Sequence, residues 1–218
     1  MEPRSRSRLR ILPAVLIAGA MALALVLPAT AAPPARRGID RQDFHDQMRK
    51  LWEDHITWTR LFIVSFAADL PDLDVTTQRL LQNQVDIGDA FRPFYGRAAA
   101  DELTQLLTEH ILGAAALLAA AKAGDTAAFE QARDAWYANA EEIAAFLHEA
   151  NPRNWPLQEM RSMMREHLDL TLSEAANRLA GNFAADVADY ERVHLAILEM
   201  ADMLSDGIIR QFPKRFAS

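Results

Sequence analysis

Apolar residues recur at three- and four-residue spacing from about residue 39 to residue 212, as in the series Phe44, Met48 and Leu51. This period is typical of amphipathic helices, whereas half-buried strands alternate with a period of two. No stretch of similar length shows that alternation. The pattern predicts an all-α fold, which excludes the α/β scaffold of nucleotide-binding enzymes.

Turn and capping residues divide the helical pattern into six segments. Pro71, Pro93, Gly124, Pro152 and Gly181 stand at or near the divisions, and proline and glycine are typical of helix ends. The expected helices cover residues 40–68, 74–93, 98–123, 125–151, 155–181 and 182–212. We therefore predict an antiparallel bundle of six helices in three hairpins, with one domain at 39–213 and a C-terminal tail at 214–218.

The last two predicted hairpins resemble each other at an offset of 57 residues. His110 and His167 each follow a glutamate, and each precedes a glycine turn by fourteen residues, at Gly124 and Gly181. A fixed offset of this kind indicates an internal duplication. The alternative, that two amphipathic helices resemble each other by chance, stays open.

The N-terminus has the composition of an export signal. Basic residues precede an uncharged stretch at 11–28 and small residues that end at Ala31; the basic residues are Arg4, Arg6, Arg8 and Arg10. These features predict a signal peptide at 1–31 followed by a tether at 32–38. The protein is then periplasmic or secreted. An uncleaved N-terminal anchor is the alternative, because the apolar stretch is long for a signal peptide.

Composition excludes several kinds of site. The 218 residues include no cysteine, which excludes disulfides, thiolate metal sites and cysteine nucleophiles. With 23 basic and 30 acidic residues the net charge is −7, which disfavours a nucleic-acid partner. Glycine-rich phosphate loops are missing. No uncharged stretch after the signal is long enough to span a bilayer, so no membrane partner is expected once the signal is cleaved.

Three histidines lie on the apolar stripes of alternate helices. His55, His110 and His167 each precede their turn by about the same number of residues, roughly 21 Å along a helix. They are therefore expected at one level of the bundle. Counting the same distance beyond each turn gives candidate partners on the returning helices. They are Asp86 or Asp89 for His55, Tyr137 and Asn139 for His110, and His194 for His167.

A histidine layer of this kind suits a transition metal ion such as Zn, Cu or Fe. The predicted ligands are His55, His110 and His167, completed by Asp86 or His194. The function expected on this basis is metal handling, storage or sensing. The alternative is a non-catalytic structural or partner-binding envelope protein whose buried histidines only fix helix packing. Haem binding and an enzyme with a metal-activated water are further alternatives, and no catalytic residue is predicted.

Several strings are similar to a group of bacterial helical proteins with no established activity. These strings are LWEDHITWTR, LLQNQVDIGDAFRPFYG, AAKAGD, WYANAEEIAAFL, EHLDLT and MADMLSDGI. The group carries labels such as glycosyltransferase or acetylglutamate kinase, and the resemblance covers nearly the whole chain after the signal. It implies a helical fold and no assigned catalytic residue. The labels themselves require an α/β scaffold that this sequence does not predict.

Overall fold

The computed structural model describes residues 38–217, and this part of the chain is helical throughout apart from its turns. The elements are α1 (Arg41–Ala67), α2 (Leu73–Ala123), α3 (Thr126–Ala150), α4 (Leu157–Leu179), α5 (Phe183–Gln211) and the short 3₁₀ helix η1 (Pro213–Arg215). The all-α prediction is confirmed for the described residues. The predicted signal peptide, and all of the tether except Gly38, lie outside them.

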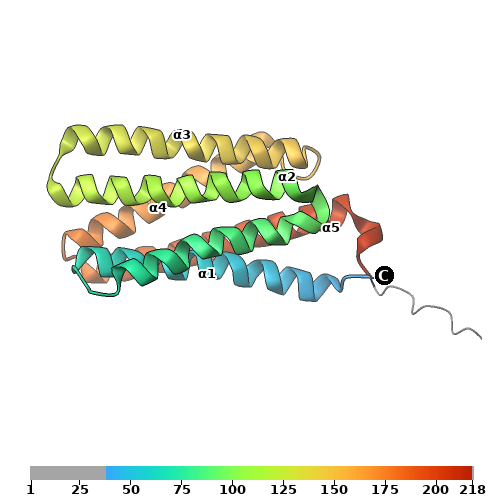
Figure 1. Ribbon diagram of the computed structural model, residues 1–218, viewed down its shortest axis with the longest axis horizontal. Helices are drawn as coiled ribbons and strands as arrows, with labels where there is room; N and C mark the ends of the chain where they lie inside the picture. The colour runs from blue at the N-terminus through green and yellow to red at the C-terminus, as the bar shows by residue number, and fades with distance from the viewer. Residues whose placement is uncertain (1–37, 218) are drawn as a thin grey trace, which may run out of the picture. The chain divides into compact units, whose positions relative to one another are not determined.

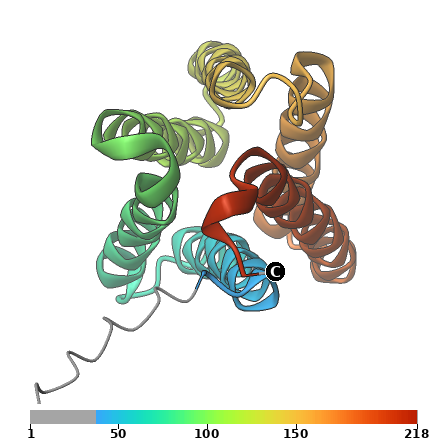
Figure 2. The same ribbon diagram turned by 90° about the vertical axis from the view of Figure 1, so that its right-hand side faces the viewer.

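The helices form a closed ring in chain order. Each helix packs against the next along the chain, and α1 also packs along α5, which joins the first helix to the last. Figure 1 shows neighbouring helices running in opposite directions, and Figure 2 shows the ring end-on. The ring places one face of every helix toward a common interior.

Residues 38–217 form five α-helices where the sequence predicted six, because α2 reverses direction without an intervening loop. The helix continues through Pro93, and the backbone leaves helical geometry only at Gly96, with φ 84° and ψ 178°. The two arms, residues 73–95 and 97–123, then pack against each other (Figure 1). A Cβ atom on Gly88 of the first arm would lie 2.0 Å from the Thr104 Oγ1 of the second.

Short local contacts hold the ends of the helices. The side chains of Asp40 and Asp125 accept hydrogen bonds from the backbone amides of Asp43 and Ala128, which caps α1 and α3. The C-terminal residues also join the fold. Ile39 pairs with Phe216 through a backbone bridge, and the Phe216 side chain is buried.

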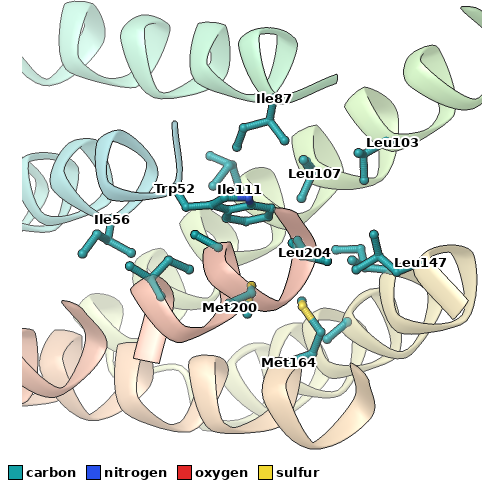
Figure 3. Packing of buried hydrophobic residues seen from close by; sticks show 14 of the residues in the cluster. Trp52, Ile56, Ile87, Leu103, Leu107, Ile111, Leu147, Met164, Met200 and Leu204 are labelled. Carbon is teal, nitrogen blue, oxygen red and sulfur yellow. The ribbon is translucent and has the colours of Figure 1, made fainter. Parts of the chain in front are cut away.

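One continuous apolar core fills the ring (Figure 3). Trp52 of α1, Ile111 of α2 and Leu204 of α5 are among the side chains that meet there. The turn between α3 and α4 adds Trp155, which is fully buried, and its indole Nε1 donates to the Met203 carbonyl of α5. Polar side chains that enter this core are therefore surrounded by apolar groups.

By length and composition, α2 is long and apolar enough to cross a membrane, whereas the sequence predicted no such segment after the signal. No other helix within residues 38–217 has this property. Core helices of bundles share that composition. In this structure α2 bends at Gly96 and packs against α1, α3 and α4.

The bend at Gly96 provides a test of the fold. We expect Gly96→Asn to lower the free energy of unfolding by about 1–3 kcal/mol, because φ 84° with ψ 178° is open almost only to glycine. The matched control is Gly124→Asn, at φ 67° and ψ 20°, where asparagine is tolerated. Neither position has an atom within 4 Å of an added Cβ. If urea unfolding shows equal losses of unfolding free energy in the two variants, the glycine-specific backbone geometry at Gly96 is wrong.

Candidate functional site

Three imidazole rings meet in the core from α1, α2 and α4. The ring centroids of His55 and His167 lie 5.7 Å apart, and those of His110 and His167 lie 6.2 Å apart. Each histidine is at most 5 % exposed. The structure therefore brings together the three histidines that the sequence assigned to one level, and we call them the histidine trio.

Asn139 of α3 determines which nitrogen of the His110 ring carries the proton. Its amide nitrogen donates to the Leu106 carbonyl at 3.1 Å, so its Oδ1 is left to accept from the His110 Nδ1 at 2.9 Å. His110 thus carries its proton on Nδ1 and has a free lone pair on Nε2. Counting residues past the turn had predicted Asn139 as a partner of His110, and this contact confirms it.

The other two rings carry buried nitrogens without partners. The Nδ1 atoms of His55 and His167 are both buried, and neither makes a hydrogen bond to any group within residues 38–217. The hydroxyl of Thr171, one turn after His167, is also buried and has no hydrogen-bond partner among the described residues. Buried polar atoms are nearly always paired, so unpaired ones call for an explanation such as a bound ion, ligand or water.

Burial keeps all three rings neutral. It lowers the pKa of His55 from 6.5 to about 3, with a further decrease from the charge of His110, while Asn83 and Gln84 oppose the shift. Burial likewise lowers the pKa of His110 to about 4, against the effect of its hydrogen bond to Asn139. The pKa of His167 falls well below 6.5 through burial and its two histidine neighbours. Neutral imidazole is the form that binds metals.

Tryptophan rings flank two of the three histidines. Trp136 stacks on His110 with ring centroids 5.2 Å apart, and Trp52 meets His55 edge-on. One helical turn further along lies a cavity of about 20 Å³ whose lining includes Thr59, Trp136 and Thr171. This volume is about that of one water molecule.

The remaining predicted ligands lie elsewhere. Asp86 is half-buried and accepts from Gln82 at 3.0 Å on the outer side of α2. His194 contacts Glu53 across the α1–α5 boundary at 2.8 Å, with its side chain 32 % exposed. The count of residues gave their level along the helix, but their angular position directs them away from the interior. Neither residue joins the trio.

The rings as they stand are not a complete metal site. Within residues 38–217, no group of three or more His, Asp or Glu side chains is placed to hold a metal ion. Two imidazoles on one tetrahedral zinc, each with its nitrogen at about 2.0–2.1 Å, have ring centres roughly 5 Å apart. The observed 5.7 and 6.2 Å both exceed that separation, so His55 and His110 would each have to move closer to His167 to share one ion with it.

A second polar cluster, which the sequence did not reveal, lies between α1, α4 and α5. The Arg60 guanidinium forms a bidentate pair with Asp186 and also donates to the Glu174 Oε1 at 2.9 Å. Asp189 accepts from Ser173 at 2.6 Å and from Asn177 at 2.8 Å. The three carboxylates are at most 2 % exposed. We call this group the carboxylate cluster.

Glu174 is the carboxylate of this cluster with a strongly raised pKa. Burial raises the pKa of Glu174 from 4.5 to about 7, because the hydrogen bond and charge of Arg60 only partly offset desolvation, and Asp186 and Asp189 add repulsion. Arg60 divides its hydrogen bonds between two carboxylates. A buried glutamic acid that titrates near neutral pH is a common feature of functional sites, although structural ion pairs produce it too.

Comparison with protein-family models, with curated proteins and with solved structures finds no match. Functional assignment therefore depends on the residues themselves.

The buried histidines predict acid sensitivity. Unfolded histidines take up protons below about pH 6.5, whereas His55 and His110 do so in the folded protein only near pH 3–4. Stability is therefore present above pH 6.5 and lost as the pH falls, by up to about 4 kcal/mol per pH unit for three histidines. His110→Gln should reduce that slope by about a third in urea unfolding from pH 6.5 to 4.5. The partly exposed His194→Gln is the control, and equal slopes in both variants would contradict the shifted pKa values.

Glu174 predicts the opposite trend at higher pH. Its folded pKa of about 7 exceeds the ordinary 4.5, so the folded state binds the proton more tightly, and stability is lost as the pH rises from 4.5 through 7. Glu174→Gln stays neutral, so its free energy of unfolding relative to that of the wild type should be about 2.5 kcal/mol higher at pH 8 than at pH 5. Glu166→Gln, on the exposed side of α4, should run parallel to the wild type. A parallel curve for Glu174→Gln would refute the raised pKa.

Proposed function

We propose that this protein is an exported helical bundle that binds one transition metal ion through His55, His110 and His167. Its role is metal handling, storage or sensing, and no catalytic step is assigned. The observation that carries the proposal is the meeting of three buried neutral imidazoles, two of which have an unpaired Nδ1.

The chemistry of the trio supports this function. Neutral imidazole suits zinc, copper and iron, and His110 offers the lone pair on Nε2 because Asn139 holds the proton on Nδ1. Metal-bound histidines usually donate their second ring N–H to a neighbouring oxygen in this way. Since Asp86 and His194 lie outside the core, the fourth position is assigned to water.

A structural role for the trio is the second candidate. The observation that favours it is the network from His110 through Asn139 to the Leu106 carbonyl, which links α2 to α3 without any ligand. Buried polar groups can fix helix register in this manner. In that case the histidines select one packing arrangement, and metal has no effect on the protein.

The duplication of the two last predicted hairpins remains part of the proposal. Gly124 and Gly181, 57 residues apart, both have a positive φ, at 67° and 75°. His110 and His167, at the same offset, are neighbours in the core. A duplicated hairpin accounts for two equivalent ligands, and the related His55 would then come from a diverged third copy.

Metal binding by histidine variants tests the proposal. The protein is purified without a histidine tag or chelator, and Zn²⁺ and Cu²⁺ affinities are measured by calorimetry and elemental analysis. We expect one ion per chain, and a loss of at least a hundredfold in affinity for His110→Ala or His167→Ala, because a three-histidine site has no replacement ligand. Metal should raise the melting temperature of the wild type by mass action.

His194→Ala and Asp86→Ala are the matched controls and should bind metal as the wild type does. Absence of stoichiometric binding by the wild type would overturn the metal function in favour of the structural one. Retention of binding in both His110→Ala and His167→Ala would locate the metal outside the trio and would equally refute the proposal.

A further inference from the structure

We propose that Glu174 is the counter-charge of the histidine site: entry of a divalent cation among the three imidazoles expels a proton from Glu174, and the resulting carboxylate balances the ion. This inference rests on the proposed metal function and adds a linkage between metal and proton binding. It gives Glu174, a buried carboxylate with no other assigned role, a part in metal binding.

The positions on α4 connect the two clusters. His167, Thr171 and Glu174 follow one another at spacings of four and three residues, so they lie on one face of the helix. All three are at most 5 % exposed, and the Thr171 hydroxyl between them has no partner. Glu174 therefore lies roughly 10 Å from His167 along the helix axis, on the same buried face of α4.

The charges around Glu174 leave its carboxyl incompletely compensated. Arg60 of α1 faces it but is also paired with Asp186 of α5, and Asp189 of α5 adds repulsion. On α4 itself, Arg178 contacts Asp186 at 3.4 Å rather than Glu174. With one guanidinium shared by two buried carboxyl groups, Glu174 is the group that holds a proton near neutral pH, consistent with its pKa of about 7.

A cation in the trio changes this balance. The three ligands are neutral, so a divalent ion would bring two uncompensated positive charges into a core of low dielectric constant, which is unfavourable. Attraction between such an ion and a carboxylate roughly 10 Å away, at an effective dielectric constant of about 20, favours ionised Glu174 by well over tenfold. The reaction is simple: the Glu174 carboxyl group becomes a carboxylate, and one proton passes to solvent.

Calorimetric titration with Zn²⁺ measures this proton directly. Titrations at pH 6.5 in two buffers of different ionisation enthalpy should show release of more than half a proton per bound ion, since most Glu174 is protonated at that pH. Zinc affinity should rise between pH 6 and pH 8. In Glu174→Gln the proton release should fall by about half a proton or more, the affinity at pH 7.5 should drop at least tenfold, and the rise in affinity between pH 6 and pH 8 should become smaller, the remainder coming from the water on the metal.

Glu166→Gln, exposed on α4, is the matched control and should behave as the wild type does. A measurement without any substitution complements it: carbon NMR of the Glu174 carboxyl should show its titration midpoint falling by at least one pH unit when Zn²⁺ binds. Zinc binding with a proton release that Glu174→Gln does not alter, or with an unmoved midpoint, would overturn this inference and leave the metal function intact. No zinc binding at any pH would overturn both.

Discussion

Three imidazoles share the centre of this bundle only as neutral rings, and that constraint governs the rest of the core. A protonated ring in this environment would be a buried charge without a partner, which is strongly unfavourable. Burial accordingly holds the pKa values of His55 and His110 near 3–4, and the charge of His110 lowers the pKa of His55 further. The surrounding side chains follow this requirement: Asn139 accepts the His110 N–H, while Trp136 and Trp52 contribute apolar faces and edges rather than charges.

Charged groups are instead gathered in the carboxylate cluster, two helical turns from the trio along α4. There Arg60 binds Asp186 and Glu174 together, so the cluster holds the buried ion pairs that the trio excludes. Thr171 lies between the two groups with an unpaired hydroxyl. This separation gives α4 a neutral ligand, a small polar residue and a titratable acid on one face, which is the arrangement that the proposed coupling between metal and proton requires.

The hydrophobic period and the helical rise predicted the all-α fold and the common level of the three histidines, because both depend only on distance along the chain. Angular position is less well determined by counting: Asp86 was predicted at the level of His55, but Asn83 and Gln84 are the buried polar residues of that turn. The predicted break between residues 93 and 98 contains the observed reversal, but the chain turns at Gly96 without a loop, so the two predicted helices form one continuous α2. Arg60 and Asp186 are 126 positions apart, and no local pattern marks such a pair.

The boundary between α1 and α5 explains how such distant residues meet. His45 contacts Asp202 at 3.1 Å, Glu53 contacts His194 at 2.8 Å, and Arg60 pairs with Asp186. Each step forward on α1 is matched by a nearly equal step backward on α5, so these contacts hold one antiparallel register along the whole boundary. His194 therefore serves to close the ring rather than to extend the trio. The same register brings Arg60 beside Asp186, and a slip of one turn between α1 and α5 would separate this guanidinium from the Asp186 carboxylate.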